Sequence, residues 1–219
     1  MRPFEELRRA MVDQQIVRRG ITDPQVLKAM GTVPRERFVS SEHTSQAYAD
    51  HPLPIRVGQT ISQPCVVARM AEALALSADS RVLDIGTGSG YAAAVLAQIA
   101  AEVFTIERHQ ILAGQAGKRF RELGYQNIHT RCGDGTLGWP EAAPFEGIAV
   151  AAGAPEPPPS LLRQLAIGGR LVIPVGDHHG GQDLLLIQRT SEDTFKQDSL
   201  GGVRFVPLVG EEAWSDQDA

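Results

Sequence analysis

Apolar residues in the first 40 positions recur at steps of three and four, the spacing of one face of a helix. The first such stripe consists of Phe4, Leu7, Met11 and Val12. Asp23 and Pro24 supply an N-cap and a first-turn proline for a second helix, which is expected to end at Gly31. The chain is therefore predicted to begin with two short amphipathic helices.

The periodicity is lost between positions 40 and 63, where prolines and Gly58 interrupt the chain. We interpret this stretch as a long loop, and loops of such length usually carry function. A further helix is predicted to begin at Pro64 and to end before Asp79, since a proline is tolerated in the first helical turn.

Beyond Arg81, short runs that are apolar throughout alternate with helical segments. The runs, predicted to be strands, lie at 82–85, 103–106, 127–131, 147–151 and 170–175. The helices predicted within the series lie at 91–100, 110–123 and 161–165. Strands of this kind are typical of a parallel sheet covered on both faces. Two further strands are predicted at 184–188 and 203–209 without a helix between them, so we expect an antiparallel pair at the end of the sheet.

The predicted fold is α/β: a doubly wound, mostly parallel seven-stranded sheet with an N-terminal helical extension. A chain of 219 residues is long enough for one full domain with a small appendage. We expect residues 1–80 to form helices and a loop packed on the core, 81–214 to form the core with its C-terminal strands, and 215–219 to be a frayed tail.

Composition and charge narrow the classes of partner. The formal net charge is −5 and the pI about 5.7, which argues against nucleic acid, a partner held mainly through its phosphates. No apolar run reaches the roughly 18 residues of a membrane span, and the start lacks the apolar core of a secretory signal. We expect a cytoplasmic monomer that binds no membrane. Cys65 and Cys132 form no C-x-x-C pair and the adjacent His178 and His179 lack a third ligand, so neither a disulfide framework nor a metal site is predicted.

The clearest chemical signal runs from Val82 to Tyr91, a strand that leads through a glycine turn into a helix. Such a turn lets a ligand approach bare backbone and meet the positive end of the helix. Tyr91 stands where the dinucleotide motif G-x-G-x-x-G requires its last glycine, so the spacing here is a different one. The candidate ligand-binding residues of the turn are Gly86, Thr87, Gly88, Ser89 and Gly90.

Acidic residues follow at the ends of the next two predicted strands. Glu107 lies about 20 residues after Gly86, where a carboxylate can accept hydrogen bonds from both ribose hydroxyls of an adenosine-containing ligand. Asp134 and Gly135 follow the third strand, and we expect them to border the adenine. The carboxyl ends of neighbouring parallel strands meet at one edge of the sheet, so all three positions would contact one ligand.

S-adenosylmethionine fits this pattern better than a phosphate-bearing ligand. The P-loop motif G-x-x-x-x-G-K is absent, and the broken dinucleotide spacing weakens the case for a nicotinamide dehydrogenase. S-adenosylmethionine is an adenosine that carries a sulfonium and has no phosphate to hold. Asp84 is expected near its methionine end, where a carboxylate complements the amino group, with capping of the loop amides as the alternative role.

A second specific stretch, Gly58-Gln59-Thr60-Ile61-Ser62-Gln63-Pro64, precedes this turn. Other segments in matching order are Val33-Pro34-Arg35, 84–91, 133–135, 168–176 and 204–208. With these segments the chain resembles the protein-L-isoaspartate O-methyltransferase family from about Met11 to Val209. The glycine turn alone would indicate only a methyltransferase of unspecified substrate.

The resemblance implies a Rossmann-like methyltransferase dependent on S-adenosylmethionine, with Ser62 as the active-site residue. It also places at the peptide cleft Gln59, Thr60, Ile61, Val206, Pro207 and Leu208. From the residues alone, Ser62 could instead cap the helix that begins at Pro64, and the segment 206–208 could be a plain buried strand.

The implied reaction is that of a protein-L-isoaspartate (D-aspartate) O-methyltransferase, a protein repair enzyme. It transfers a methyl group from S-adenosylmethionine to the free α-carboxylate of L-isoaspartyl residues in damaged proteins and peptides. An S-adenosylmethionine-binding module without catalysis and a carboxyl methyltransferase acting on a small molecule stay open as alternatives. The sequence departs from the family's usual residues at Cys65, Glu146, Gly147 and Ala151, but these departures spare Ser62 and the predicted adenosine residues.

Overall fold

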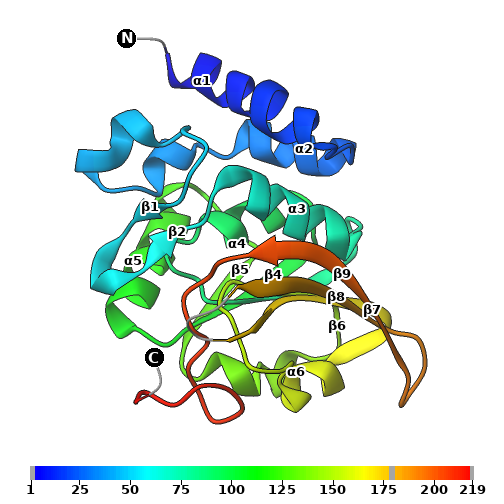
Figure 1. Cartoon of the computed structure of the whole chain (residues 1–219). Helices are drawn as coiled ribbons and strands as arrows, with labels where there is room; N and C mark the ends of the chain where they lie inside the picture. The colour runs from blue at the N-terminus through cyan, green and yellow to red at the C-terminus, as the bar shows by residue number, and fades with distance from the viewer. Residues whose placement is uncertain (1–2, 178–180, 218–219) are drawn as a thin grey trace.

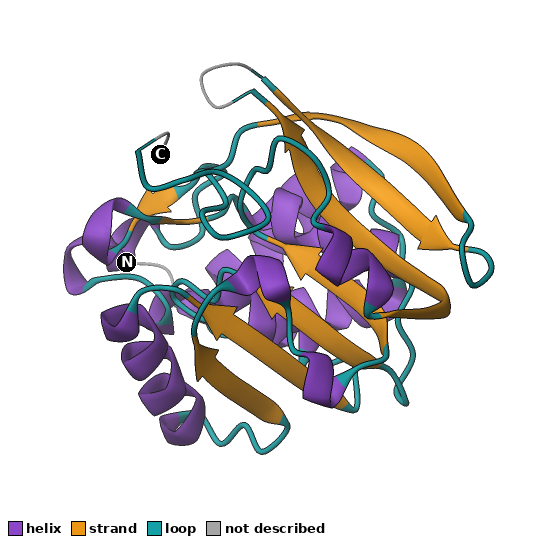
Figure 2. Cartoon of the chain, turned by 90° about the horizontal axis from the view of Figure 1, so that it is seen from below, coloured by secondary structure: helices purple, strands orange, loops and turns teal. Residues whose placement is uncertain are grey.

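The computed structural model describes residues 3–177 and 181–217. In this part of the chain seven strands form one sheet in the order β5-β4-β3-β6-β7-β8-β9 (Figures 1 and 2). They are β3 (Arg81–Ile85), β4 (Glu102–Glu107), β5 (Ile128–Cys132), β6 (Phe145–Val150), β7 (Leu165–Gly176), β8 (Gln182–Arg189) and β9 (Phe195–Val203). The strands from β5 to β7 pair in parallel, and β8 and β9 are antiparallel. The predicted fold, a mostly parallel seven-stranded sheet, is confirmed.

Helices cover both faces of this sheet, which is why its central strands are apolar throughout. Val82 of β3 belongs to a core shared with the N-terminal helices, whereas its neighbour Leu83 belongs to the core on the opposite face. In Figure 1, α6 lies across the sheet from α1, α2 and α3. The helices are α1 (Phe4–Met11), α2 (Pro24–Thr32), α3 (Pro64–Leu74), α4 (Tyr91–Leu96), α5 (Gln110–Glu122) and α6 (Pro159–Arg163). None of the helices in the described part has the length and apolar character needed to cross a membrane.

The N-terminal helices form where the sequence predicts them. The carboxylate of Asp23 accepts hydrogen bonds from the amides of Gln25 and Val26, at 2.7 and 3.1 Å, and so caps α2. The helix runs to Thr32, one residue beyond the predicted end. Residues between 40 and 63 contain two short 3-10 helices, Ser41–Gln46 and Arg56–Gly58, and a hairpin of two-residue strands, β1 (Leu53–Pro54) with β2 (Thr60–Ile61). This segment is a long connection, as expected.

The last strand was placed wrongly by the sequence pattern. The strand paired with β8 is β9 (Phe195–Val203), and not 203–209. β9 is an edge strand with mostly exposed side chains, so it lacks the apolar signature of the central strands. The apolar residues from 204 to 209 instead cross the carboxyl edge of the sheet, where Pro207 bridges to Gly153.

The order of strands reverses between β3 and β6. From β3 the chain moves through β4 to β5, then returns to the other side of β3 to form β6 and β7. In doubly wound sheets, ligands bind outside the carboxyl ends of the strands at such a reversal. The functional residues should therefore gather where β3, β4 and β6 end.

Candidate active site

A cavity of about 380 Å³ opens at this edge of the sheet. The cavity is lined by the ends of β3 and β4 and by the start of the connection that follows β6. Its main lining segments are the loop 58–62, the turn 85–89, the β4 end 106–109 and the crossing segment 206–209. These segments are distant in the sequence, and the structure brings them to a single site.

Three glycines shape the turn after β3. Gly86, Gly88 and Gly90 have positive φ angles of 90°, 53° and 92°, a region that residues with a Cβ rarely adopt. A Cβ on Gly90 would lie 2.6 Å from the ring of Phe120, so Gly90 also permits α5 to pack closely. Gly86, Thr87, Gly88 and Ser89 line the cavity, whereas Gly90 lies outside its lining.

Glu107, the last residue of the neighbouring strand β4, binds the backbone of this turn. Its Oε2 accepts a hydrogen bond from the amide of Gly88 at 2.8 Å, and its Oε1 accepts one from the amide of His109 at 2.9 Å. The residue is 5% exposed and lines the cavity. Each carboxylate oxygen has two lone pairs, so both oxygens can still accept a hydroxyl of a bound ribose.

Asp84 is fully buried below the turn. Its Oδ2 accepts a hydrogen bond from the Thr105 hydroxyl at 2.7 Å, and its Oδ1 has no partner. Burial raises the pKa of this carboxyl to about 6, the Thr105 hydrogen bond lowers the pKa in part, and the charge of Glu107 raises it further. The alternative role of Asp84 as a cap for the loop amides is wrong, because the amides of Gly86 and Thr87 donate to the Ile106 carbonyl and that of Gly88 donates to Glu107. Instead, Asp84 lines a second cavity of about 20 Å³, which Ser62 also lines.

Ser62 stands at the junction of the two cavities and lines both. The N-cap of α3 is Gln63, without a side-chain capping hydrogen bond, so the alternative capping role of Ser62 is also wrong. Among the described residues, none forms a hydrogen bond with the Ser62 hydroxyl. The hydroxyl is therefore available to a ligand in the cavity.

Arg35 fixes the backbone of Ser62, a role that the sequence did not reveal. Arg35 is 0% exposed, and its guanidinium donates to the carbonyls of Ala47, at 2.7 Å, and Ser62, at 2.8 Å. The guanidinium carbon lies 4.7 Å from the ring centre of Tyr91, the first residue of α4. Its Nη1 has no partner, and burial lowers the pKa of the side chain. The motif Val33-Pro34-Arg35 was the available signal, but a motif does not tell which backbone atoms an arginine will reach.

The residues expected at the peptide cleft all line the same cavity. Gln59, Thr60 and Ile61 lie on one wall, and Val206, Pro207 and Leu208 lie on another. The second wall is fixed by main-chain hydrogen bonds of 2.7 Å, from the Gly153 amide to the Val206 carbonyl and from the Leu208 amide to the Gly153 carbonyl. The segment is therefore a paired wall of the cavity and not a strand of the sheet.

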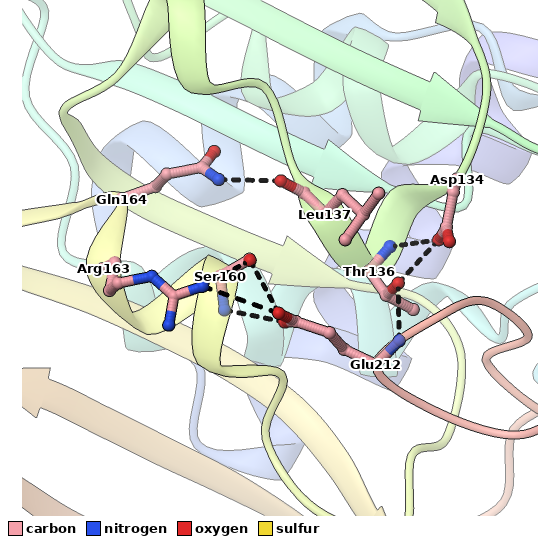
Figure 3. A network of polar contacts seen from close by, with 7 residues as sticks. All are labelled: Asp134, Thr136, Leu137, Ser160, Arg163, Gln164 and Glu212. Atoms are coloured by element: carbon pink, nitrogen blue, oxygen red, sulfur yellow. Dashed lines mark hydrogen bonds and ion pairs between the residues drawn. The ribbon is translucent and has the colours of Figure 1, made fainter.

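Asp134 and Gly135 differ in their placement. Gly135 lines the cavity, and a Cβ there would lie 2.5 Å from Cγ2 of Ile85. Asp134 is outside the cavity lining, where its carboxylate accepts from the amide and hydroxyl of Thr136, at 2.8 and 2.7 Å (Figure 3). It also accepts from the amide of Glu211, at 2.8 Å. The structure thus places Gly135, but not the Asp134 side chain, beside the space expected for adenine.

The C-terminal tail lies beside the same site. Asp216 lines the cavity and forms an ion pair with Arg108. The tail was expected to be frayed over 215–219, of which residues 218 and 219 lie outside the described part. His178 and His179, for which no metal was expected, also lie outside the described residues.

Comparison with known proteins gives a consistent family. A family model for protein-L-isoaspartate(D-aspartate) O-methyltransferase matches residues 6–213. The chain is 62% identical over 211 residues to protein-L-isoaspartate O-methyltransferase 2 of Marinobacter nauticus, and the match covers 96% of each chain. It is 56% identical over 218 residues to the protein-L-isoaspartate O-methyltransferase of Brucella anthropi, with 100% of both chains covered.

Solved structures agree with these sequence matches. One protein-L-isoaspartate O-methyltransferase superposes with a TM-score of 0.85 at 28% identity, over 96% of this chain and 67% of that one. Another, from Plasmodium falciparum and in complex with S-adenosyl-L-homocysteine, superposes with a TM-score of 0.79 at 26% identity, over 95% of this chain and 99% of that one. The chain belongs to the protein-L-isoaspartate(D-aspartate) O-methyltransferase family.

Proposed function

We propose that this chain is a repair enzyme that methylates the free α-carboxylate of L-isoaspartyl residues in damaged proteins and peptides, with S-adenosylmethionine as the methyl donor. The observation that carries the proposal is that the Ser62 loop and the glycine turn line one cavity. Membership of the family supports the reaction, and the positions of the two segments support the roles of individual residues.

The residues present suit the cofactor. Glu107 would accept hydrogen bonds from the ribose hydroxyls, and Gly86, Thr87, Gly88 and Ser89 would give the ligand access to the backbone of the turn. Gly135 would border the adenine. Asp84, whose Oδ1 lacks a partner, is suited to the positively charged methionine end. When bound, S-adenosylmethionine supplies an electrophilic methyl group on its sulfonium.

The reaction asks the protein for alignment more than for acid-base chemistry. A carboxylate with a reference pKa of about 4 is already ionised at neutral pH and needs no general base. The attacking oxygen, the methyl carbon and the sulfur must be nearly collinear, at an approach of about 3 Å. We assign Ser62 the task of orienting the carboxylate through a hydrogen bond from its free hydroxyl.

The walls of the cavity favour this encounter. Sulfonium and carboxylate attract each other, and the attraction is stronger in a site from which water is partly excluded. Val206, Pro207 and Leu208 would offer apolar contacts and main-chain pairing, which tolerate many sequence contexts, and Gln59, Thr60 and Ile61 line the same cavity.

The proposal extends to the setting of the enzyme. Residues 1–80 would act as a substrate-facing part on the methyltransferase core 81–214. We propose a cytoplasmic monomer that binds neither nucleic acid nor membrane. The net charge of −5 disfavours a polyanionic partner, and the free thiols of Cys65 and Cys132 suit a reducing compartment.

Labelled S-adenosylmethionine and a matched pair of peptides, one isoaspartyl and one aspartyl, test the function. Base-labile methyl ester should form on the isoaspartyl peptide only, and Ser62→Ala should suppress it. Equal labelling of both peptides would contradict the substrate assignment. Cofactor binding without any turnover would favour a non-catalytic module, and labelling of a metabolite instead would favour a small-molecule carboxyl methyltransferase.

A further inference from the structure

The segment 206–209 forms a wall of the cavity although it is not part of the sheet. Beyond it the chain turns at 210–213 and comes back, so that the Trp214 amide donates to the Leu208 carbonyl at 3.1 Å. The Trp214 indole also donates to the Gly153 carbonyl, at 3.1 Å. The position of the wall therefore depends on how the turn 210–213 is held.

Two carboxylates from different parts of the chain hold this turn (Figure 3). Asp134, in the connection after β5, accepts the Glu211 amide, and the adjacent Glu212 amide donates to the Thr136 hydroxyl at 3.2 Å. The Glu212 carboxylate accepts from the amide and hydroxyl of Ser160 in α6, at 2.7 and 2.8 Å. The turn is thus tied to the cofactor side of the sheet and to α6 at once.

The fit around these anchors is close. A Cβ on Gly210 would lie 2.1 Å from Oδ1 of Asp134, so the turn approaches this carboxylate directly. Arg163 adds a weaker contact, with its Nη2 3.5 Å from Oε1 of Glu212. Neither Asp134 nor Glu212 lines the cavity, so both act on the site only through the chain they hold.

We propose that Asp134 and Glu212 are positioning residues of the methyl transfer, which fix the wall 206–209 at the distance from the Ser62 loop that a peptide requires. The inference rests on the proposed function, because the wall is assigned to the peptide. It gives Asp134 a different task from the adenine contact predicted from the sequence.

The glutamine variant separates hydrogen bonding from charge at Glu212, and the asparagine variant removes the charge and one hydrogen bond at Asp134. Asp134→Asn can still accept from Thr136, but its amide nitrogen would face the Glu211 amide, donor against donor. Glu212→Gln can accept from the Ser160 amide and donate to the Ser160 hydroxyl, so it should rescue the loss caused by Glu212→Ala. Glu211→Ala is the matched control, because its exposed side chain takes no part in the anchors.

The experiment measures peptide methylation at saturating S-adenosylmethionine for these four variants. Glu212→Ala, which removes two hydrogen bonds to a charged group, and Asp134→Asn, which removes one, should each raise the KM for an isoaspartyl peptide about tenfold or more. The kcat at saturating peptide and the Kd for S-adenosylhomocysteine should change less than threefold or so. Glu212→Gln and Glu211→Ala should behave as the wild type.

Hydrogen exchange of the amides 206–214 gives a readout that needs no turnover. Exchange should be faster in Glu212→Ala and Asp134→Asn than in the wild type and in Glu211→Ala. The inference is overturned if Glu212→Ala matches Glu211→Ala in KM and exchange, or if Glu212→Gln is as impaired as Glu212→Ala. An inactive wild type with normal exchange differences would contradict the proposed function but not the anchoring.

Discussion

Replacing Asp84 with asparagine should make the free protein more stable at neutral pH and weaken its hold on the cofactor. An asparagine side chain is nearly the same size as that of aspartate, can still accept the Thr105 hydroxyl, and cannot ionise. The wild-type carboxylate is buried with an unpartnered Oδ1, so its ionised form is disfavoured in the absence of a ligand.

The size and sign of the stability effect follow from the pKa. Burial raises the pKa of Asp84 from 3.8 to about 6, which corresponds to about 3 kcal/mol at about 1.4 kcal/mol per pKa unit. The folded state binds the proton more tightly than the unfolded state. The contribution of Asp84 to stability is therefore fully present below pH 4 or so, and is lost as the pH rises to about 6.

Urea unfolding of the wild type and Asp84→Asn between pH 4 and pH 8 checks this reasoning. The free energies of unfolding should agree at pH 4, and the variant should be more stable by about 3 kcal/mol at pH 7. Other titrating groups cancel in this difference. A difference that does not change with pH, or a variant that is less stable at pH 7, would refute the account of Asp84.

The same variant should lose affinity for the cofactor while it gains stability, and calorimetric titration with S-adenosylhomocysteine measures that affinity. If Asp84 complements the ammonium of the ligand, binding should be about tenfold weaker at pH 8 in Asp84→Asn, as expected for the loss of one charge-assisted contact. Unchanged affinity would remove Asp84 from the cofactor site.

Three further substitutions test other parts of the site. Ser62→Ala should lower kcat about tenfold to a hundredfold, since it removes a hydrogen bond to a charged carboxylate, while S-adenosylhomocysteine affinity measured by calorimetry stays the same. Arg35→Met leaves the buried Ala47 carbonyl and the partly buried Ser62 carbonyl without donors and should reduce the free energy of unfolding in urea by about 1–4 kcal/mol, with a higher peptide KM; an unchanged KM would disconnect Arg35 from the Ser62 loop. Gly135→Ala places a Cβ 2.5 Å from Cγ2 of Ile85 and should weaken S-adenosylhomocysteine binding, whereas Gly133→Ala, with no atom within 4 Å, should not.

The central fold could be predicted because its elements carry local signals. The β3 strand is buried on both faces and therefore apolar throughout, and α2 has its capping Asp23 and Pro24 in sequence. The edge strand β9 could not be predicted in this way, because its mostly exposed side chains give no apolar pattern in the sequence. The segment 204–209 was instead predicted to be part of a strand and is not one. Its apolar residues form a wall of the cavity, and the local pattern of apolar residues does not distinguish such a wall from a strand.

The functional site also contains some features that the sequence predicts and others that it does not. The glycine turn and Glu107 could be predicted because their spacing reflects the backbone geometry of one strand-turn-helix unit and its neighbour. The partners of Asp134 could not, because Glu211 and Glu212 come from the far end of the chain, and only the folded structure brings them next to the β5 connection. Long-range contacts of side chains leave no local signature.

Two buried charged side chains lie beside Ser62. Arg35 and Asp84 each retain a buried polar atom without a hydrogen-bond partner. Arg35 donates to the carbonyl of Ser62, and Asp84 lines the small cavity that Ser62 also lines. Unpaired charges in the interior destabilise a protein. The proposed reaction brings an ammonium, a sulfonium and a carboxylate beside the small cavity that Asp84 and Ser62 line, so the Asp84 charge, costly in the free enzyme, becomes useful once the ligands arrive. Arg35 lines neither cavity, and its charge serves to hold the Ser62 carbonyl. Cofactor binding should then lower the pKa of Asp84, and proton release on binding near pH 6 is the consequence that follows from this arrangement.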